Sequence, residues 1–282
     1  MDVIAHGGAG SPPDDPSSRQ TVLDNAAARG LDAATPLDAV VATINVLESD
    51  PAFNAGVGSA VQSDGDIRTD AGLMTDDGEV GAACAMRGVE HAVDVARAVL
   101  EETPHVLLAG EPARDFAFAH GIETDGNLWT ERTRNRWQDA SPGESVSDHL
   151  AWLADHFGGH DTVGAVATDG ERIAAGTSTG GRWGALAGRV GDVPQIGAGF
   201  YTSSAGGASA TGAGEDIARE ALARAAVERL ESGGTPQTAA REAIESFEER
   251  AEGTAGVIVL AEDGTAGSAY SSDAMQTATA RR

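Results

Sequence analysis

The chain has 282 residues, of which 44 are acidic and 19 are basic, and its formal net charge is −25 at pH 7. Hydrophobic residues make up 41 % of it, which is enough to bury a sizeable core and excludes wholesale disorder. No apolar run approaches the roughly 18 residues that span a bilayer, and residues 1–6 lack the features of a signal peptide, so we expect a cytoplasmic protein. Cys84 is the single cysteine, which excludes an internal disulfide framework and a multi-cysteine metal site.

The type and distribution of the charges are also informative. Every basic residue is an arginine, and the acidic residues are spread along the chain rather than gathered in a tail. A surface this anionic repels nucleic acid and acidic membranes, so we expect neither as a partner. It also repels itself, and salt at about 1 M shortens the Debye length to about 3 Å. The composition therefore predicts adaptation to high salt.

Strand-like and helix-like segments alternate along the chain. We expect strands at residues 3–6, 67–74, 80–86, 162–167, 172–177, 256–260 and 266–270. We expect helices at residues 18–34, 37–47, 92–100, 112–120, 146–157 and 215–230, and one more that ends near residue 250. The polar segment 121–144 is expected to be a solvated excursion anchored by Trp137. Asp169-Gly170 and Asp263-Gly264 are typical of hairpin turns, the second closing the chain. The order of elements predicts layered α/β packing.

Patterns for several other kinds of chemistry are incomplete. Residues 197–199 and 212–214 read Gly-Ala-Gly, but neither completes a dinucleotide-binding fingerprint after a strand. Gly158 and Gly159 lie between His156 and His160, which disfavours one helix that presents both histidines to a metal. The chain lacks a G-x-S-x-G elbow, and Cys84 lies in an apolar strand, so neither a serine nor a cysteine triad is supported.

Thr162 occupies a position at which cleavage of the chain would make it a nucleophile. It begins a valine- and glycine-rich strand directly after the loop 157–161. A threonine within a chain is a poor nucleophile, but an N-terminal threonine carries its own base, an α-amine with a pKa of about 7.7–8.0. Cleavage between Asp161 and Thr162 would create that arrangement. From composition alone, an ordinary β-branched residue at a strand start is the simpler interpretation.

Six further segments follow one another in order along the chain. They are His6-Gly7-Gly8-Ala9-Gly10, Phe53-Asn54-Ala55-Gly56-Val57-Gly58-Ser59, Asp161-Thr162-Val163-Gly164-Ala165-Val166-Ala167, Thr177-Ser178-Thr179-Gly180-Gly181, Gly188-Arg189-Val190-Gly191-Asp192 and Ala210-Thr211-Gly212. Together they resemble the plant-type L-asparaginase/isoaspartyl peptidase family of N-terminal-nucleophile (Ntn) hydrolases. The resemblance covers residues 3 to about 272. It implies one αββα-sandwich domain over residues 1–282, cut autocatalytically into an α chain (1–161) and a β chain (162–282). It also implies hydrolysis of the L-asparagine side-chain amide and of β-aspartyl peptides.

The resemblance also implies catalytic roles. Thr162 matches the nucleophile, whose hydroxyl would first attack the carbonyl of Asp161 and later the substrate. Thr179 matches a threonine whose hydroxyl lies beside the nucleophile. Thr211 and Gly212 match the oxyanion hole, where losing one donor typically costs about 10²–10³ in turnover.

Substrate recognition is implied in the same way. Arg189 matches the arginine that clamps the substrate α-carboxylate, Asp192 matches the carboxylate that receives the α-ammonium, and Gly212 also borders the substrate. A planar guanidinium and a carboxylate suit a zwitterionic amino-acid head. Backbone carbonyls of the segment 53–62 match a structural sodium site. The resemblance implies no organic or redox cofactor and a homodimer of αβ units.

Two departures from the family pattern keep alternatives open. The family usually has glycine before the nucleophile, whereas this chain has His160-Asp161, as in the glycosylasparaginase branch. Gln62 stands where relatives have an asparagine that assists the oxyanion or the substrate, so Gln62 is a candidate contact. Hydrolysis of the N-acetylglucosamine–asparagine linkage is therefore one alternative. An uncleaved protein that binds amino acids through Arg189 and Asp192 is the other.

Overall fold

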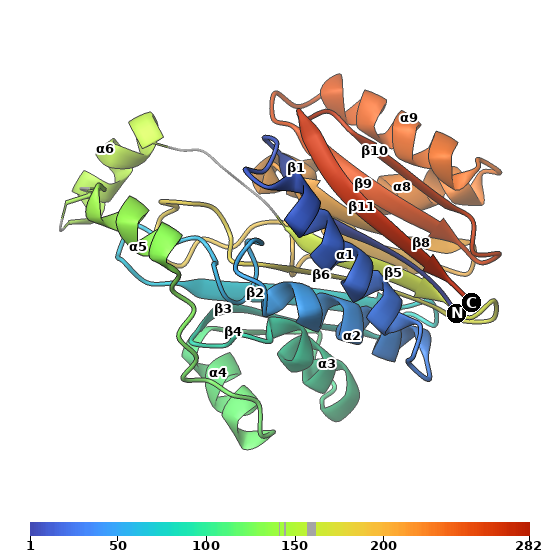
Figure 1. Ribbon diagram of the computed structural model, residues 1–282, viewed down its shortest axis with the longest axis horizontal. Helices are drawn as coiled ribbons and strands as arrows, with labels where there is room; N and C mark the ends of the chain where they lie inside the picture. The colour runs from blue at the N-terminus through green and yellow to red at the C-terminus, as the bar shows by residue number, and fades with distance from the viewer. Residues whose placement is uncertain (141, 144, 157–161) are drawn as a thin grey trace.

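The computed structural model describes residues 1–140, 142–143, 145–156 and 162–282, and in it two sheets lie face to face (Figure 1). The larger sheet has the order β11–β1–β5–β6–β2–β3–β4, and the smaller has the order β10–β9–β8–β7. The larger sheet comprises β1 (Asp2–Gly10), β2 (Arg68–Thr75), β3 (Val80–Arg87), β4 (Leu107–Ala109), β5 (Val163–Thr168), β6 (Ile173–Thr179) and β11 (Ala274–Arg281). The smaller comprises β7 (Phe200–Ser203), β8 (Gly206–Gly212), β9 (Ala255–Ala261) and β10 (Ala266–Tyr270).

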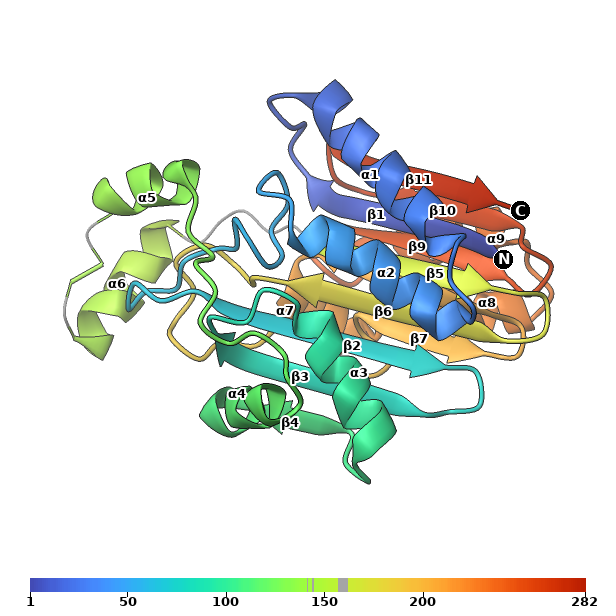
Figure 2. The same ribbon diagram turned by 60° about the horizontal axis from the view of Figure 1, so that its bottom comes forward.

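Helices cover the outer face of each sheet, as the two views show (Figures 1 and 2). The larger sheet is covered by α1 (Pro16–Gly30), α2 (Pro36–Glu48), α3 (Ala92–Glu102) and α4 (Gly110–Ala119). The smaller sheet is covered by α8 (Leu222–Glu231) and α9 (Pro236–Glu248), with the short α7 (Gly214–Glu220) at its end. Helices α5 (Glu131–Gln138) and α6 (Val146–His156) lie to one side of the layers. This arrangement confirms the predicted αββα sandwich.

The apolar residues explain why the layers hold together. Helix α2 begins at its cap Thr35, which accepts the Asp38 N–H, and its buried Val40, Ile44 and Leu47 recur at helical spacing. They belong to the buried cluster between the helices and the larger sheet. A second buried cluster fills the space between the sheets, and a third lies under α8 and α9. Among the residues that the structure describes, every helix is too short or too polar to cross a membrane.

The prediction for residues 121–144 was wrong in part, because α5 lies within this segment. Its first turn is fixed by a capping box between Thr130 and Thr133. The helix is almost entirely polar, so an apolar period could not reveal it. The predicted anchor is confirmed: Trp137 is half-buried and meets Trp183 edge-on at a ring distance of 6.4 Å.

Two further predictions need correction. The expected helix 215–230 is broken at Ala221, which has φ +49°, so that α7 and α8 are separate helices. The hairpin of β9 and β10 exists, but it does not close the chain, because β11 follows and pairs with β1 along nearly its whole length. Strands β4, β7, β8 and β11 were not predicted. Strands β8 and β11 are rich in glycine, alanine, serine and threonine rather than in large apolar residues, and β4 and β7 are only three and four residues long.

Candidate active site

Thr162 is the residue immediately before β5, and it is buried at one end of the space between the sheets. On β5 and β6, Val163 is paired with Ser178, so the next position along places Thr162 beside Thr179. On the other side of β6, Thr179 is paired with Asp70 of β2. Because residues opposite one another in a sheet point to the same face, Thr162, Thr179 and Asp70 share one face.

Thr211 of β8 reaches the predicted nucleophile from the smaller sheet. Its Oγ1 accepts the backbone N–H of Thr162 at 3.2 Å and the backbone N–H of Ala9, also at 3.2 Å. The backbone nitrogen that cleavage would turn into an α-amine is therefore already held by the opposite sheet. Both lone pairs of the Thr211 hydroxyl are occupied, so its own proton remains available for donation.

Gly212 follows Thr211 in a conformation that suits only glycine. Its φ is +133°, and a Cβ there would come within 2.4 Å of the Thr254 carbonyl oxygen. The absence of a side chain lets the end of β8 approach β9 closely. The predicted oxyanion-hole segment is thus fixed by its close contact with β9.

A buried histidine links the two sheets just beyond the nucleophile. His6 Nε2 lies 2.8 Å from Ser209 Oγ, joining β1 to β8. A Cβ on Gly164 would lie 1.9 Å from that hydroxyl oxygen, so glycine is required where β5 passes under the pair. Burial lowers the pKa of His6 to about 3, which keeps the ring uncharged.

Arg189 and Asp192 converge at the N-terminus of α7. A Cβ on Gly214 would lie 2.7 Å from Arg189 Nη2 and 2.6 Å from Asp192 Oδ1, so both groups face the space that this glycine leaves free. Arg189 Nε donates to Glu215 Oε1 at 2.8 Å. The predicted cation and anion therefore lie side by side, with Glu215 as an additional partner.

The two buried carboxyl groups near Arg189 are strongly perturbed. Burial raises the pKa of Asp192 to about 6, against the opposing effect of Arg189. Burial also raises the pKa of Asp70 to about 7, opposed by the Ala85 N–H that Asp70 Oδ1 accepts at 2.7 Å. Asp192 Oδ2 is buried and has no hydrogen-bond partner among the described residues. A buried oxygen of this kind is satisfied by an added donor, such as a substrate ammonium.

Thr179 is held by the loop that carries the segment 53–62. Its Oγ1 accepts the Gly181 N–H at 3.0 Å and lies 3.4 Å from the Asn54 carbonyl oxygen. The Asn54 side chain donates to the Gly181 carbonyl at 2.7 Å and accepts the Ala60 N–H at 2.8 Å. The loop therefore fixes the end of β6 on which Thr179 lies.

The side-chain amide of Gln62 is hydrogen-bonded to neighbouring protein groups. Its Oε1 accepts the Gly188 N–H at 2.9 Å and an Arg68 N–H at 2.7 Å, while its Nε2 donates to the Arg189 carbonyl at 3.2 Å. The side-chain amide thus holds the backbone on both sides of the Gly188–Arg189 peptide. Asp161, the other half of the predicted cleavage site, lies outside the described residues.

Asp70 and Glu215 were not among the predicted site residues. Asp70 is an acidic residue within the otherwise largely apolar run 67–74, a placement that is costly unless the group has a role or a partner. That signal was available. Glu215 had none, because an acidic residue in the first turn of a helix is common for the helix dipole alone.

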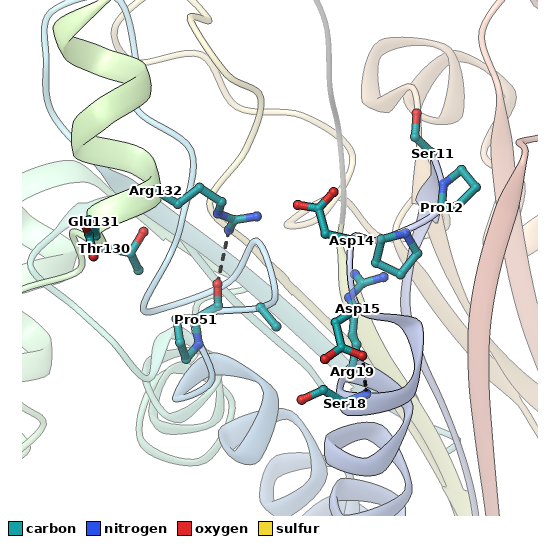
Figure 3. Close-up of a pocket in the computed structure, with 12 residues that line it drawn as sticks. Ser11, Pro12, Asp14, Asp15, Ser18, Arg19, Pro51, Thr130, Glu131 and Arg132 are labelled. Atoms are coloured by element: carbon teal, nitrogen blue, oxygen red, sulfur yellow. Dashed lines mark hydrogen bonds between the residues drawn. The ribbon is translucent and has the colours of Figure 1, made fainter.

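A cavity of about 590 Å³ lies beside the segments that carry the site (Figure 3). Residues 11–15, Ser18, Arg19, Pro51, Ala52 and 130–132 line it, and none of the predicted site residues that the structure describes is among them. Arg19 links it to the segments 6–10 and 53–59, because its guanidinium donates to the Gly7 carbonyl and lies 4.7 Å from the Phe53 ring centre.

Cys84 is buried, and burial raises its pKa to about 12. The thiol is therefore protonated and a poor nucleophile, in keeping with the sequence analysis.

Comparison with known proteins agrees with this geometry. A family model described as asparaginase matches residues 1–282. The chain is 39 % identical over 287 residues to a plant-type L-asparaginase of Pyrococcus abyssi, which covers 94 % of this chain and 91 % of the relative. It is 36 % identical over 297 residues to an isoaspartyl peptidase/L-asparaginase of Danio rerio, covering 99 % of this chain and 92 % of the relative. A protein of the latter name from Rattus norvegicus is 38 % identical over 274 residues, with coverages of 93 % and 80 %. The chain belongs to the asparaginase family.

Proposed function

We propose that this protein hydrolyses the side-chain amide of L-asparagine and the isopeptide bond of β-aspartyl peptides, with Thr162 as an N-terminal nucleophile. The observation that carries the proposal is the position of Thr162. Its backbone nitrogen is hydrogen-bonded to the Thr211 hydroxyl, and Thr179 lies beside it across the sheet. Membership of the asparaginase family and the names of the relatives support the reaction.

Maturation would precede catalysis. In the intact chain, the Thr162 hydroxyl attacks the carbonyl carbon of residue 161, its proton passes to the Thr162 nitrogen, the C–N bond breaks, and the acyl group thus moves from nitrogen to oxygen. Water then hydrolyses the ester. The products are a 1–161 chain with a free carboxylate and a 162–282 chain with a free α-amine on Thr162. The Thr211 contact, which holds that nitrogen, supports this sequence of steps.

Catalysis would follow the same path on the substrate. The Thr162 amine accepts the hydroxyl proton, and the oxygen attacks the side-chain carbonyl carbon. The Thr211 hydroxyl and the Gly212 N–H stabilise the oxyanion. Ammonia, or the amine of the peptide product, leaves with a proton, and a β-aspartyl enzyme remains. Water hydrolyses this ester and releases aspartate. The occupied lone pairs on Thr211 support its role as donor.

The substrate head group would be recognised by charge. Arg189 binds the α-carboxylate through its planar guanidinium, and Asp192 accepts the α-ammonium. The convergence of both groups at Gly214 supports this assignment, as does Asp192 Oδ2, for which the described part of the chain offers no hydrogen-bond donor. The bound ammonium would supply such a donor.

Recognition should depend on pH through Asp192. Its raised pKa of about 6 means that the carboxyl is protonated, and unable to pair with an ammonium, in mildly acidic solution. We therefore expect the affinity for the product L-aspartate to rise about tenfold per pH unit below pH 6 and to level off above it. Calorimetric titration between about pH 4.5 and 8 measures this. The control variant Asp70→Asn retains an acceptor for the Ala85 N–H, and its affinity for L-aspartate should still level off near pH 6. An affinity that stays flat over this range contradicts the assignment.

Glycosylasparaginase activity is the second candidate, because His160-Asp161 precedes the nucleophile. The two activities are distinguished by measuring kcat/KM of a single protein preparation with L-asparagine, β-aspartyl-leucine and N-acetylglucosaminyl-asparagine. We expect the first two substrates to be preferred by at least about tenfold. Preference for the glycosylated substrate would instead assign the protein to the glycosylasparaginase activity.

We also propose a sodium site and a homodimer. The cation would be held by backbone carbonyls of the segment 53–62, whose Phe53 carbonyl oxygen faces the space that Gly58 leaves free, 3.1 Å from its Cβ position, and oxygen ligands of this kind suit a hard cation. Val106, Leu107 and Phe118, exposed at the β4 edge of the larger sheet, support association with a second copy. Exchanging sodium for potassium tests the cation site. Measuring the mass of the assembly in solution tests the homodimer.

We further propose adaptation to high salt, which the net charge of −25 and the absence of lysine support. The melting temperature should rise between dilute buffer and molar KCl, because screening relieves repulsion among carboxylates. Each kcal/mol gained corresponds to about 2–4 °C in a chain of this size. Sucrose, which strengthens burial without screening, is the control. A melting temperature that is unchanged or lower in KCl refutes the proposal.

A further inference from the structure

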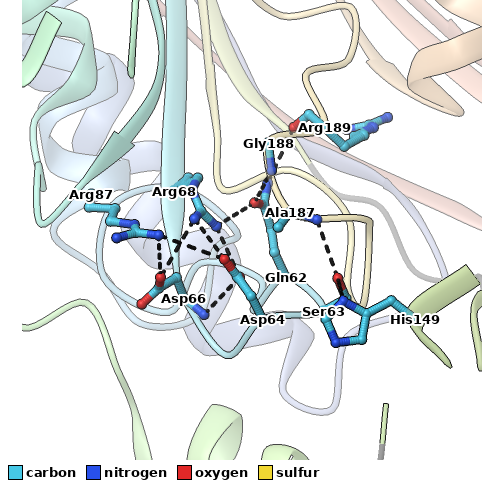
Figure 4. Close-up of polar contacts among 10 residues, drawn as sticks. All are labelled: Gln62, Ser63, Asp64, Asp66, Arg68, Arg87, His149, Ala187, Gly188 and Arg189. Atoms are coloured by element: carbon cyan, nitrogen blue, oxygen red, sulfur yellow. Dashed lines mark hydrogen bonds and ion pairs between the residues drawn. The ribbon is translucent and has the colours of Figure 1, made fainter. Parts of the chain in front are cut away.

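The backbone of Arg189 is held by side chains that the proposed mechanism does not use. Ser63 and Gln62 lie beside residues 185–189: the Ser63 N–H donates to the Ala185 carbonyl at 2.8 Å, and the Ala187 N–H donates to Ser63 Oγ at 3.2 Å. Gln62 continues this pairing with its side chain, which contacts both Gly188 and Arg189 (Figure 4). The loop that carries the carboxylate clamp therefore depends on this neighbouring segment for its position.

The orientation of the Gln62 amide is set by Arg68. Arg68 Nη1 donates to Gln62 Oε1 at 2.7 Å, so the amide oxygen must face Arg68 and the Gly188 N–H, and the amide nitrogen must face the Arg189 carbonyl. The reversed amide would set oxygen against the Arg189 carbonyl oxygen and N–H against the Gly188 N–H. Only one of the two orientations is thus compatible with the loop, and Arg68 selects it.

Arg68 is itself fixed rather than mobile. It is 9 % exposed, and its two terminal nitrogens donate to Asp64 Oδ1 at 3.0 Å and Oδ2 at 2.8 Å in a bidentate pair. Asp66 lies 3.5 Å away, and the half-exposed Arg87 binds Asp66 at 2.6 Å from the outer side. A rigid, charged support of this kind can transmit a defined geometry to the amide that it contacts.

We propose that Gln62 and Arg68 are positioning residues for Arg189, which set the guanidinium where it meets the substrate α-carboxylate. The proposal rests on the function proposed above. Neither residue needs to touch the substrate: Arg68 orients the Gln62 amide, and the amide holds the peptide between Gly188 and Arg189. A displacement of about 1 Å at such a clamp is enough to cost up to about 10²-fold in rate.

The test compares L-asparagine with its α-carboxamide, which lacks the carboxylate that Arg189 binds. Arg68→Met removes the guanidinium at similar length without changing the clamp itself. We expect the ratio of kcat/KM values for the two substrates to fall by about 10- to 100-fold, mainly through KM for L-asparagine, with chain splitting unchanged. Gln62→Met should have the same effect, and the double variant should be no worse than Gln62→Met, since both act through one contact.

Arg87→Met is the matched control, because Arg87 belongs to the same charged group but makes no contact with Gln62 among the described residues. It should keep the wild-type ratio. The proposal is overturned if Gln62→Met keeps the wild-type ratio, if Arg87→Met lowers it equally, or if chain splitting is lost together with the ratio. If the Arg68→Met variant does not fold, the ratio of the kcat/KM values of the Gln62→Met variant for the two substrates decides whether the proposal holds. A wild-type protein that hydrolyses neither substrate would refute the proposed function instead.

Discussion

Thr162→Ala is expected to abolish both the splitting of the chain and the hydrolysis of asparagine. The same hydroxyl is needed for attack on residue 161 and for attack on the substrate, and alanine provides no alternative. Removing a covalent nucleophile from a hydrolase lowers kcat by a factor on the order of 10⁶. Electrophoresis after incubation in high salt and an ammonia-release assay measure the two effects. The variant should remain folded, since the Thr162 backbone N–H still donates to Thr211.

Thr162→Ser is the matched control, because it retains the hydroxyl and loses only a methyl group. It should split, more slowly, and keep measurable activity. The two variants together separate loss of the nucleophile from loss of packing at this buried position. A Thr162→Ala protein that still divides into two chains would show that the cleavage does not depend on this hydroxyl.

Arg189→Ala is expected to leave chain splitting intact and to raise KM strongly. Removing one partner of a buried, hydrogen-bonded charge pair costs about 2–5 kcal/mol, which corresponds to about 30-fold or more in KM. The loss should fall on KM because the clamp binds the substrate head equally before and during the reaction. Steady-state kinetics with L-asparagine measure it, and electrophoresis follows splitting in the same sample.

Arg172→Ala is a suitable control for this effect. Arg172 forms an ion pair with Asp169, three residues away, which is also the spacing between Arg189 and Asp192 in the sequence. The Arg172 side chain, however, is 56 % exposed at the β5–β6 turn. Exposed pairs of this kind contribute about 0–1 kcal/mol, so KM should stay within a factor of about two. An Arg189→Ala protein with a wild-type KM contradicts the carboxylate clamp.

Large parts of the fold could be predicted because their residues carry strong local signals. Helix α2 has an N-cap, a proline at its start and apolar residues at helical spacing, and β5 and β6 are joined at Asp169-Gly170. Strand β8 and helix α5 carry no such signal. The first is built of small residues whose burial depends on the opposite sheet, and the second is polar except for Trp137 and begins at a capping box. The break at Ala221 is likewise a tertiary effect that no local pattern shows.

The residues of the site likewise fall into those that the sequence could predict and those that it could not. The segments around Thr162, Thr179, Arg189 and Thr211 could be found because their order resembles a family. Side-chain partners across the fold could not, because contacts such as Arg189 with Glu215 depend on loops that meet only in three dimensions. Gln62 illustrates the difference: its sequence position indicates a substrate contact, whereas its hydrogen bonds connect it to Arg68 and the loop that carries Arg189.

The intact mass of purified, salt-equilibrated protein that hydrolyses asparagine tests the central claim most directly. The account predicts that the 28.5 kDa chain is replaced by two polypeptides, one ending at Asp161 and the other beginning with Thr162. Active material that contains only the unbroken 28.5 kDa chain would contradict it.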